Sequence, residues 1–109
     1  MNYKEIIIKK LEKYKPEKII ITEHTKIQAL RREISLREVK ENILHPKRLT
    51  VAIRQNAQKE GEEKYDCYFA YSNTQCQRYI LVINKECVVC TVIKINRRWQ
   101  RIAEKNAKI

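Results

Sequence analysis

Apolar residues recur at helical spacing in the first part of the chain and alternate with polar residues in the second. Residues 3–14 predict a helix with Ile7, Leu11 and Tyr14 on one face. The Lys15-Pro16 step ends this helix, because a residue before proline is disfavoured in the helical conformation. The run Ile19 to Ile21 then predicts a short extended lead-in to the next helix.

Two more helices are predicted before Pro46. The first covers about residues 22–33, with Thr22 as its cap. The second begins at Ser35, which forms a capping box with Glu38. The expected buried residues are Ile27, Leu30 and Ile34 for the first of these helices and Leu36, Val39, Ile43 and Leu44 for the second.

After Pro46 the pattern becomes that of strands. Strands are predicted over residues 48–58, 65–71, 77–83 and 87–95, and the last is nearly all β-branched and therefore central. Asn96 then caps a final helix over residues 97–107. Its expected apolar face consists of Trp99, Ile102 or Ala103, and Asn106.

This order of elements predicts an α+β fold in which N-terminal helices pack on a four-stranded antiparallel sheet, followed by a C-terminal helix. The 109 residues fit a single domain, because no repeat or linker divides them. Residues 18–95 would form its core, and residues 1–17 and 96–109 would be helical extensions.

The charge balance narrows the class of partner. Lys and Arg total 24 against 13 acidic residues, a net charge of +11. Such an excess favours RNA, DNA or an acidic protein as partner. The alternative is a Lys/Glu/Ile-rich composition of the kind thermophiles use, with charge serving solubility. The sequence has no membrane-length apolar stretch and no signal-peptide core, which predicts a cytoplasmic protein without membrane contact.

Four cysteines invite a metal or disulfide interpretation. Cys87 and Cys90 have zinc-ligand spacing, but the intervening Val-Val is strand sequence, which points the two thiols to opposite faces. Buried apolar cysteines are therefore the favoured prediction, ahead of a disulfide and of zinc. No metal and no cofactor are expected.

His24 is the strongest candidate for acid–base chemistry. It falls in the first turn of a predicted helix, where the helix dipole favours the neutral imidazole. Arg31 lies roughly 10 Å further along the same face by helical rise. The only other histidine, His45, precedes Pro46 and is predicted to be a cation at a helix end.

The sequence also resembles a small bacterial and archaeal family of unknown function. The resemblance rests on Ile21-Thr22-x-His24, on Arg31 or Arg32 followed by Ile34-Ser35 and Val39, on Pro46, and on the later strands, including Thr91-Val92. It covers about residues 19–95. Members of that family are similar to RelE/ParE and colicin-D-like toxins, several of which are encoded in toxin–antitoxin operons. The resemblance implies a compact helix-covered sheet and an RNA-cleaving activity that needs no metal, although ParE-type relatives target a topoisomerase.

Metal-independent RNA cleavage needs a base, an acid and a cation that stabilises charge on the phosphate. The resemblance favours His24, Arg31, Arg32 and Thr91 as this group. The expected nucleic-acid contacts are Arg54 and Arg78 on strands, Lys94 on the last strand, and Arg97, Arg98, Arg101, Lys105 and Lys108 on the basic last helix. That helix could equally contact an acidic antitoxin.

The leading hypothesis is therefore a toxin-type endoribonuclease of a toxin–antitoxin system. Two alternatives stay open: a basic nucleic-acid-binding protein without activity, and a protein-binding module. The sequence does not define the oligomeric state.

Overall fold

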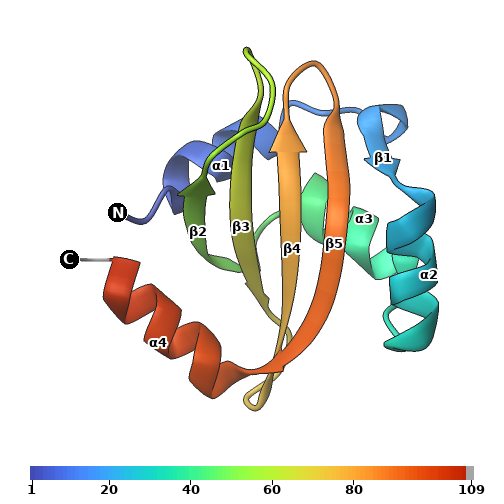
Figure 1. The fold of residues 1–109 in the computed structure, drawn as a ribbon. Helices are drawn as coiled ribbons and strands as arrows, with labels where there is room; N and C mark the ends of the chain where they lie inside the picture. Colours follow the sequence, from blue (N-terminus) through green and yellow to red (C-terminus); the bar gives the residue numbers. More distant parts are fainter. Residues whose placement is uncertain (108–109) are drawn as a thin grey trace.

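The computed structural model describes residues 1–107, so the predicted role of Lys108 lies outside the described residues. The elements in chain order are α1 (Lys4–Leu11), the 3₁₀ helix η1 (Pro16–Lys18), β1 (Ile19–Ile21), α2 (Glu23–Arg31), α3 (Leu36–Leu44), β2 (Leu49–Gln55), β3 (Glu63–Ala70), β4 (Gln75–Ile83), β5 (Cys87–Asn96) and α4 (Arg97–Ala107). The α+β class is confirmed (Figure 1). No helix in this part of the chain is both long and apolar enough to cross a membrane.

The sheet has five strands in the order β1-β5-β4-β3-β2, so the prediction of four antiparallel strands is wrong. The run Ile19–Ile21 is itself a strand, and it pairs in parallel with Cys87–Val89 of β5. The other three pairings are antiparallel, as expected for strands joined by short turns. A run of three β-branched isoleucines favours a strand. Ile19 is also buried in the core, with 3% of its surface exposed, which adds to the stability of this pairing.

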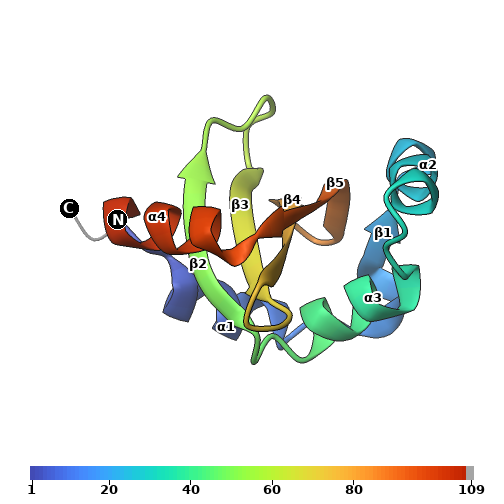
Figure 2. The ribbon, with the colours of Figure 1, turned by 90° about the horizontal axis from the view of Figure 1, so that it is seen from below.

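Helices α1 and α3 cover one face of the sheet and enclose the main core (Figures 1 and 2). The predicted stripes of these two helices are confirmed at Ile7, Leu11, Val39 and Ile43, all fully buried. They pack with the sheet residues of the same cluster, the largest of which are Tyr65, Phe69, Tyr79 and Leu81. Residues before 18 thus contribute directly to the core.

The opposite face of the sheet is covered at one side only. Helix α4 packs there over a small cluster formed by Val51, Tyr68, Cys76 and Ala107. No helix crosses the middle of this face, which lies open between α4 and α2 (Figure 2). We call it the open face.

The predicted apolar faces of α2 and α4 are confirmed only at Ile34, which is buried, and at Ala103, which packs on the small cluster; the other expected residues are exposed. Ile27 and Leu30 of α2 are 51% and 82% exposed, whereas Thr25 and Ala29 are buried. In α4 the buried residues are Gln100 and Ala107, and Trp99 is 56% exposed. Both helices dock through small or polar side chains whose hydrogen bonds are satisfied, a solution that apolar periodicity does not reveal.

Helix α2 ends in a tight turn with an unusual residue in it. The Ile34 N–H donates to Ala29 O at 2.8 Å and the Glu33 N–H donates to Leu30 O at 3.4 Å, the hydrogen bonds of a Schellman motif. Glu33 has φ +54°, a left-handed conformation that glycine adopts without strain. This turn sets the angle at which the chain enters α3.

We expect Glu33→Gly to raise the free energy of unfolding by about 1 kcal/mol, because it removes the left-handed strain at the end of α2. Urea unfolding measures the change. Glu12→Gly is the matched control, since Glu12 also follows a helix but has φ −63°. It should destabilise the protein. Destabilisation of equal size by both substitutions would contradict the strain argument.

Candidate nucleic-acid interface

Helix α2 is fixed to the edge of the sheet by polar side chains. Thr22 caps the helix, and its side chain accepts a hydrogen bond from the Thr25 N–H. The Thr25 hydroxyl, fully buried, donates to Val89 O at 2.8 Å. The predicted cap is therefore confirmed, and it stands at the point where β1 ends and α2 begins.

Gln28 of α2 and Arg32, which directly follows this helix, bind the backbone of a single β5 residue. Gln28 Oε1 accepts from the Val92 N–H at 3.3 Å, and Arg32 Nη1 donates to Val92 O at 2.7 Å. Residues 28 and 32 lie one helical turn apart on the same face of α2. They thus satisfy both backbone groups that Val92 directs away from β4.

His24 extends this row by one more turn. Its Nε2 lies 2.9 Å from Gln28 Nε2. Because Gln28 Oε1 accepts from Val92, the nitrogen of the Gln28 amide faces His24, and an amide nitrogen only donates. His24 Nε2 is therefore the acceptor, so this contact selects the tautomer of the imidazole that carries its proton on Nδ1.

The predicted catalytic residues are linked only through other groups. Arg32 binds Val92 O directly, whereas His24 hydrogen bonds to Gln28, which in turn accepts from the Val92 N–H. Within residues 1–107 no hydrogen bond joins His24 to an arginine. Thr91 precedes Val92, is half-buried and pairs with Ile80. Arg78 and Ile80 are alternate residues of β4 and share a face of the sheet. Thr91, which pairs with Ile80, therefore lies on the same face as Arg78. Arg31 is exposed on α2.

Arg78 stands on the open face, but its charge is compensated. Its Nε and Nη2 donate to the two carboxylate oxygens of Asp66 at 2.7 and 2.6 Å. Tyr68 donates to the same carboxylate at 3.3 Å, and the guanidinium lies 5.3 Å from the Tyr68 ring centroid. The hydrogen bonds to Asp66 raise the pKa of Arg78. Arg78 is thus a fixed donor, one-third exposed, rather than a free charge.

The other predicted contacts are dispersed. Arg54 pairs with Tyr65 of β3, and Arg78 pairs with Tyr68 of the same strand. Tyr65 and Tyr68 are three positions apart, so they point to opposite faces of the sheet, and so do the two arginines. Lys94 lines a shallow hollow with Thr74 and Asn96. Arg97 donates hydrogen bonds to Gln100 Oε1 and to Ser72 O. The exposed cations of α4 are Arg98, Arg101 and Lys105.

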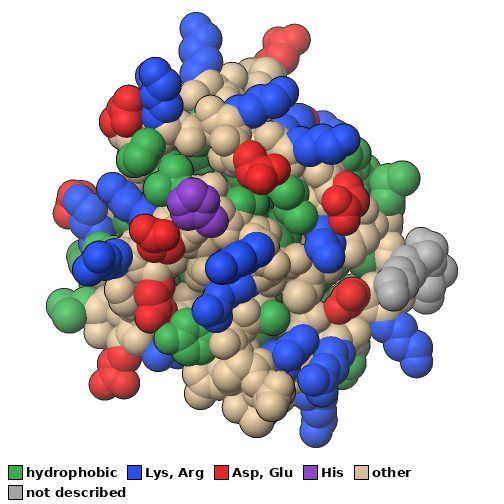
Figure 3. Space-filling view, turned by 180° about the vertical axis from the view of Figure 1, so that it is seen from behind, with side chains coloured by type: hydrophobic (Ala, Val, Ile, Leu, Met, Phe, Trp, Pro, Cys, Tyr) green, Lys and Arg blue, Asp and Glu red, His purple; other side chains and the backbone are tan. Residues whose placement is uncertain are grey.

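A polar hollow of about 540 Å³ beside α3 was not predicted. Glu38 does not complete the predicted capping box but accepts hydrogen bonds from Tyr71 at 3.0 Å and Gln77 at 3.4 Å. His45 also lines this hollow, with Arg48 stacked 5.4 Å from the Tyr71 ring centroid. The sequence places His45 and Arg48 on either side of Pro46, but no pattern in it marks Glu38 and Tyr71 as their neighbours. On this helix-covered face acidic and basic side chains are intermixed, and one histidine is visible (Figure 3).

All four cysteines are free thiols, and Cys67, Cys76 and Cys87 are buried, as predicted. Burial raises the pKa of Cys76 and of Cys87 to about 12, so neither is a thiolate at neutral pH. No cluster of three or more metal-binding side chains occurs within residues 1–107.

Comparison with family models, with curated proteins and with solved structures found no match to this chain.

The hydrogen bond between Gln28 and His24 leads to a prediction that spectroscopy can test. We expect the His24 ring to show the Nδ1–H neutral tautomer in ¹⁵N–¹H correlation spectra at alkaline pH. Gln28→Leu removes the donor to Nε2 and should return the ring to the Nε2–H tautomer that free imidazole side chains prefer. His45 provides the internal control in the same spectra, and an Nε2–H tautomer of His24 in the wild type would contradict the arrangement.

Proposed function

We propose that this chain is a RelE/colicin-D-like toxin-type domain that binds RNA across the open face, between α2 and α4. The observation that carries the proposal is the open face itself, with cations on the helices at both of its sides. Arg98, Arg101 and Lys105 follow one exposed face of α4 at spacings of three and four residues. Cations on the helices at both sides of this face attract a polyanion such as a single RNA strand.

Metal-independent cleavage of the bound RNA is the leading activity, with His24 and Arg32 as its residues. His24 Nε2 would exchange Gln28 for a 2′-hydroxyl and take its proton, so that the 2′-oxygen attacks phosphorus. The bond from phosphorus to the 5′-oxygen then breaks, and the 5′-oxygen takes up a proton from water. Arg32 uses one N–H on Val92 O, and its other N–H groups remain to stabilise charge on the phosphate.

A nucleic-acid-binding protein without activity is the second candidate. It is favoured by the hydrogen bond of Gln28 to His24 Nε2, which occupies the lone pair that a general base requires. In this case His24 contributes only the Nδ1–H as a donor to RNA.

A protein-binding module is the third candidate, favoured by α4. Trp99 and Ile102 are 56% and 44% exposed among its cations, and such a mixed surface suits an acidic amphipathic segment of an antitoxin.

If the chain is an endoribonuclease, His24→Ala should reduce RNA cleavage by about 100-fold or more, the contribution typical of one general acid or base. The assay uses a labelled RNA in EDTA, with folding of the variant checked by circular dichroism. His45→Ala is the matched control for loss of an imidazole. Cleavage by the wild type no faster than by His24→Ala would eliminate the enzyme hypothesis.

RNA binding is tested independently of cleavage. We expect the affinity for single-stranded RNA to fall steeply with salt, and the Arg98→Gln/Arg101→Gln/Lys105→Gln variant to lower the log–log slope by about 2, at roughly 0.7 per phosphate contact. Binding of RNA with a slope near zero would contradict phosphate recognition. Binding of an acidic peptide but not of RNA would favour the protein-binding module.

A further inference from the structure

A second cationic site lies at the end of the sheet where β4 turns into β5. It is a hollow of about 620 Å³, within the range of ordinary ligand sites. We call it the lysine hollow. Its walls come from the end of α1, from η1 and the segment before it, from the β2–β3 loop and from the β4–β5 turn. The lining residues are Lys10, Lys13, Tyr14, Lys15, Lys18, Gly61, Glu63, Ile83, Asn84 and Lys85.

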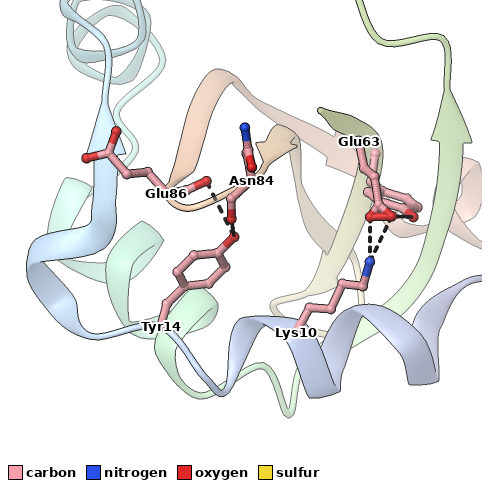
Figure 4. Close-up of polar contacts among 6 residues, drawn as sticks. Lys10, Tyr14, Glu63, Asn84 and Glu86 are labelled. Atoms are coloured by element: carbon pink, nitrogen blue, oxygen red, sulfur yellow. Dashed lines mark hydrogen bonds and ion pairs between the residues drawn. The ribbon is translucent and has the colours of Figure 1, made fainter. Parts of the chain in front are cut away.

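Its charge is almost entirely positive. Glu63 is the single acidic residue that lines it, and its carboxylate is bound by Lys10 Nζ, with 2.8 Å to Oε1 (Figure 4). The hydrogen bond from Lys10 lowers the pKa of Glu63, so this carboxylate stays ionised and paired. Across residues 1–107 the ion pairs are those of Lys10, Lys26 and Arg78. The remaining lining cations, Lys13, Lys15, Lys18 and Lys85, therefore have no carboxylate partner in the described part of the chain.

The frame of the lysine hollow is held in place by a tyrosine. Tyr14 donates its hydroxyl to Asn84 O at 2.6 Å, and Glu86 O lies 3.4 Å from the same hydroxyl (Figure 4). Burial is the main cause that raises the pKa of Tyr14 to about 12, so the hydroxyl remains a donor at physiological pH. This bond ties the end of α1 to the β4–β5 turn. The Glu86 side chain points away from Tyr14 and Lys10 (Figure 4).

Four lysines without a carboxylate partner, three from residues 13–18 and one from the β4–β5 turn, thus line one concavity. Like charges on the walls of a concave surface repel one another and concentrate a positive potential within it. An anion relieves that repulsion, and several linked anionic groups relieve it further. Lysine ammonium groups bind phosphate as point charges and need no fixed geometry, which suits mobile side chains around a rigid floor.

We propose that the lysine hollow binds consecutive phosphate groups of an RNA strand. The RNA as ligand rests on the proposed function, whereas phosphate binding by the hollow does not. A slim, flexible chain enters a concavity that a flat membrane or the surface of a folded protein does not fill. Free polyphosphates share the same chemistry, so the experiment separates the two sources.

The test compares two triple variants with the same change of charge. Lys13→Gln/Lys18→Gln/Lys85→Gln removes cations from the lysine hollow. Lys9→Gln/Lys40→Gln/Lys47→Gln removes exposed cations that do not line it. Inorganic tripolyphosphate binding is followed by calorimetry and by amide shifts of residues 10–18 and 83–86, and single-stranded RNA binding is followed across a salt series.

We expect the hollow variant to weaken tripolyphosphate at least tenfold and to lower the salt slope for RNA by about 2, at roughly 0.7 per phosphate contact. The control variant should change neither by a comparable amount. Tripolyphosphate binding lost in the hollow variant with an unchanged RNA slope would reject RNA and leave free polyphosphate as the ligand.

Equal effects of both variants would overturn the proposal, because the lysines would then act only as diffuse charge. RNA binding that persists without tripolyphosphate binding would overturn the lysine hollow and leave the proposed function standing. Binding of tripolyphosphate without binding of RNA would leave phosphate binding by the lysine hollow standing, and it would overturn both RNA as its ligand and the proposed function.

Discussion

The docking of α2 on the edge of β5 is the constraint from which the arrangement of this protein follows. Strand β1 pairs with β5 only as far as Val89. Beyond that residue β5 would leave backbone N–H and C=O groups without partners beside a packed core. Thr25, Gln28 and Arg32 supply those partners at Val89 and Val92. Each such bond adds about 1 kcal/mol, but a buried group left unpaired costs about 1–3 kcal/mol, so α2 and the sheet edge depend on each other.

This way of closing the edge decides what remains exposed. A helix that docks through threonine, glutamine and arginine does not bury its isoleucine and leucine, and Leu30 is 82% exposed as a result. It also lies beside the sheet rather than across it, so the middle of one face stays uncovered (Figures 1 and 2). The same bonds that complete the sheet fix the His24 ring through Gln28. Stability and the candidate interface are therefore built from one row of side chains.

The positive charge is distributed unevenly around this frame. Arg78 on the open face is neutralised by a nearly buried Asp66, which makes it a rigid donor. On the helix-covered face acidic and basic side chains alternate (Figure 3). Cations without an ion-pair partner follow the exposed side of α4 and line the lysine hollow. Within residues 1–107 the ion pairs involve only Lys10, Lys26 and Arg78, so most of the cations behind the net charge of +11 have no carboxylate partner.

The sequence by itself determined the α+β class, the Thr22 and Ser35 caps, the faces of α1 and α3 and the burial of Cys67, Cys76 and Cys87. These features depend on the spacing of apolar residues and on local hydrogen bonds, which the order of residues encodes directly. Only the tertiary structure decided that Ile19–Ile21 joins the sheet, that α2 and α4 bury polar faces, and that Glu38 turns toward Tyr71. It also brought lysines from α1, η1 and a distant β-turn around one hollow. Such contacts join residues far apart in the chain, and their partners are backbone groups or charges that no periodicity marks.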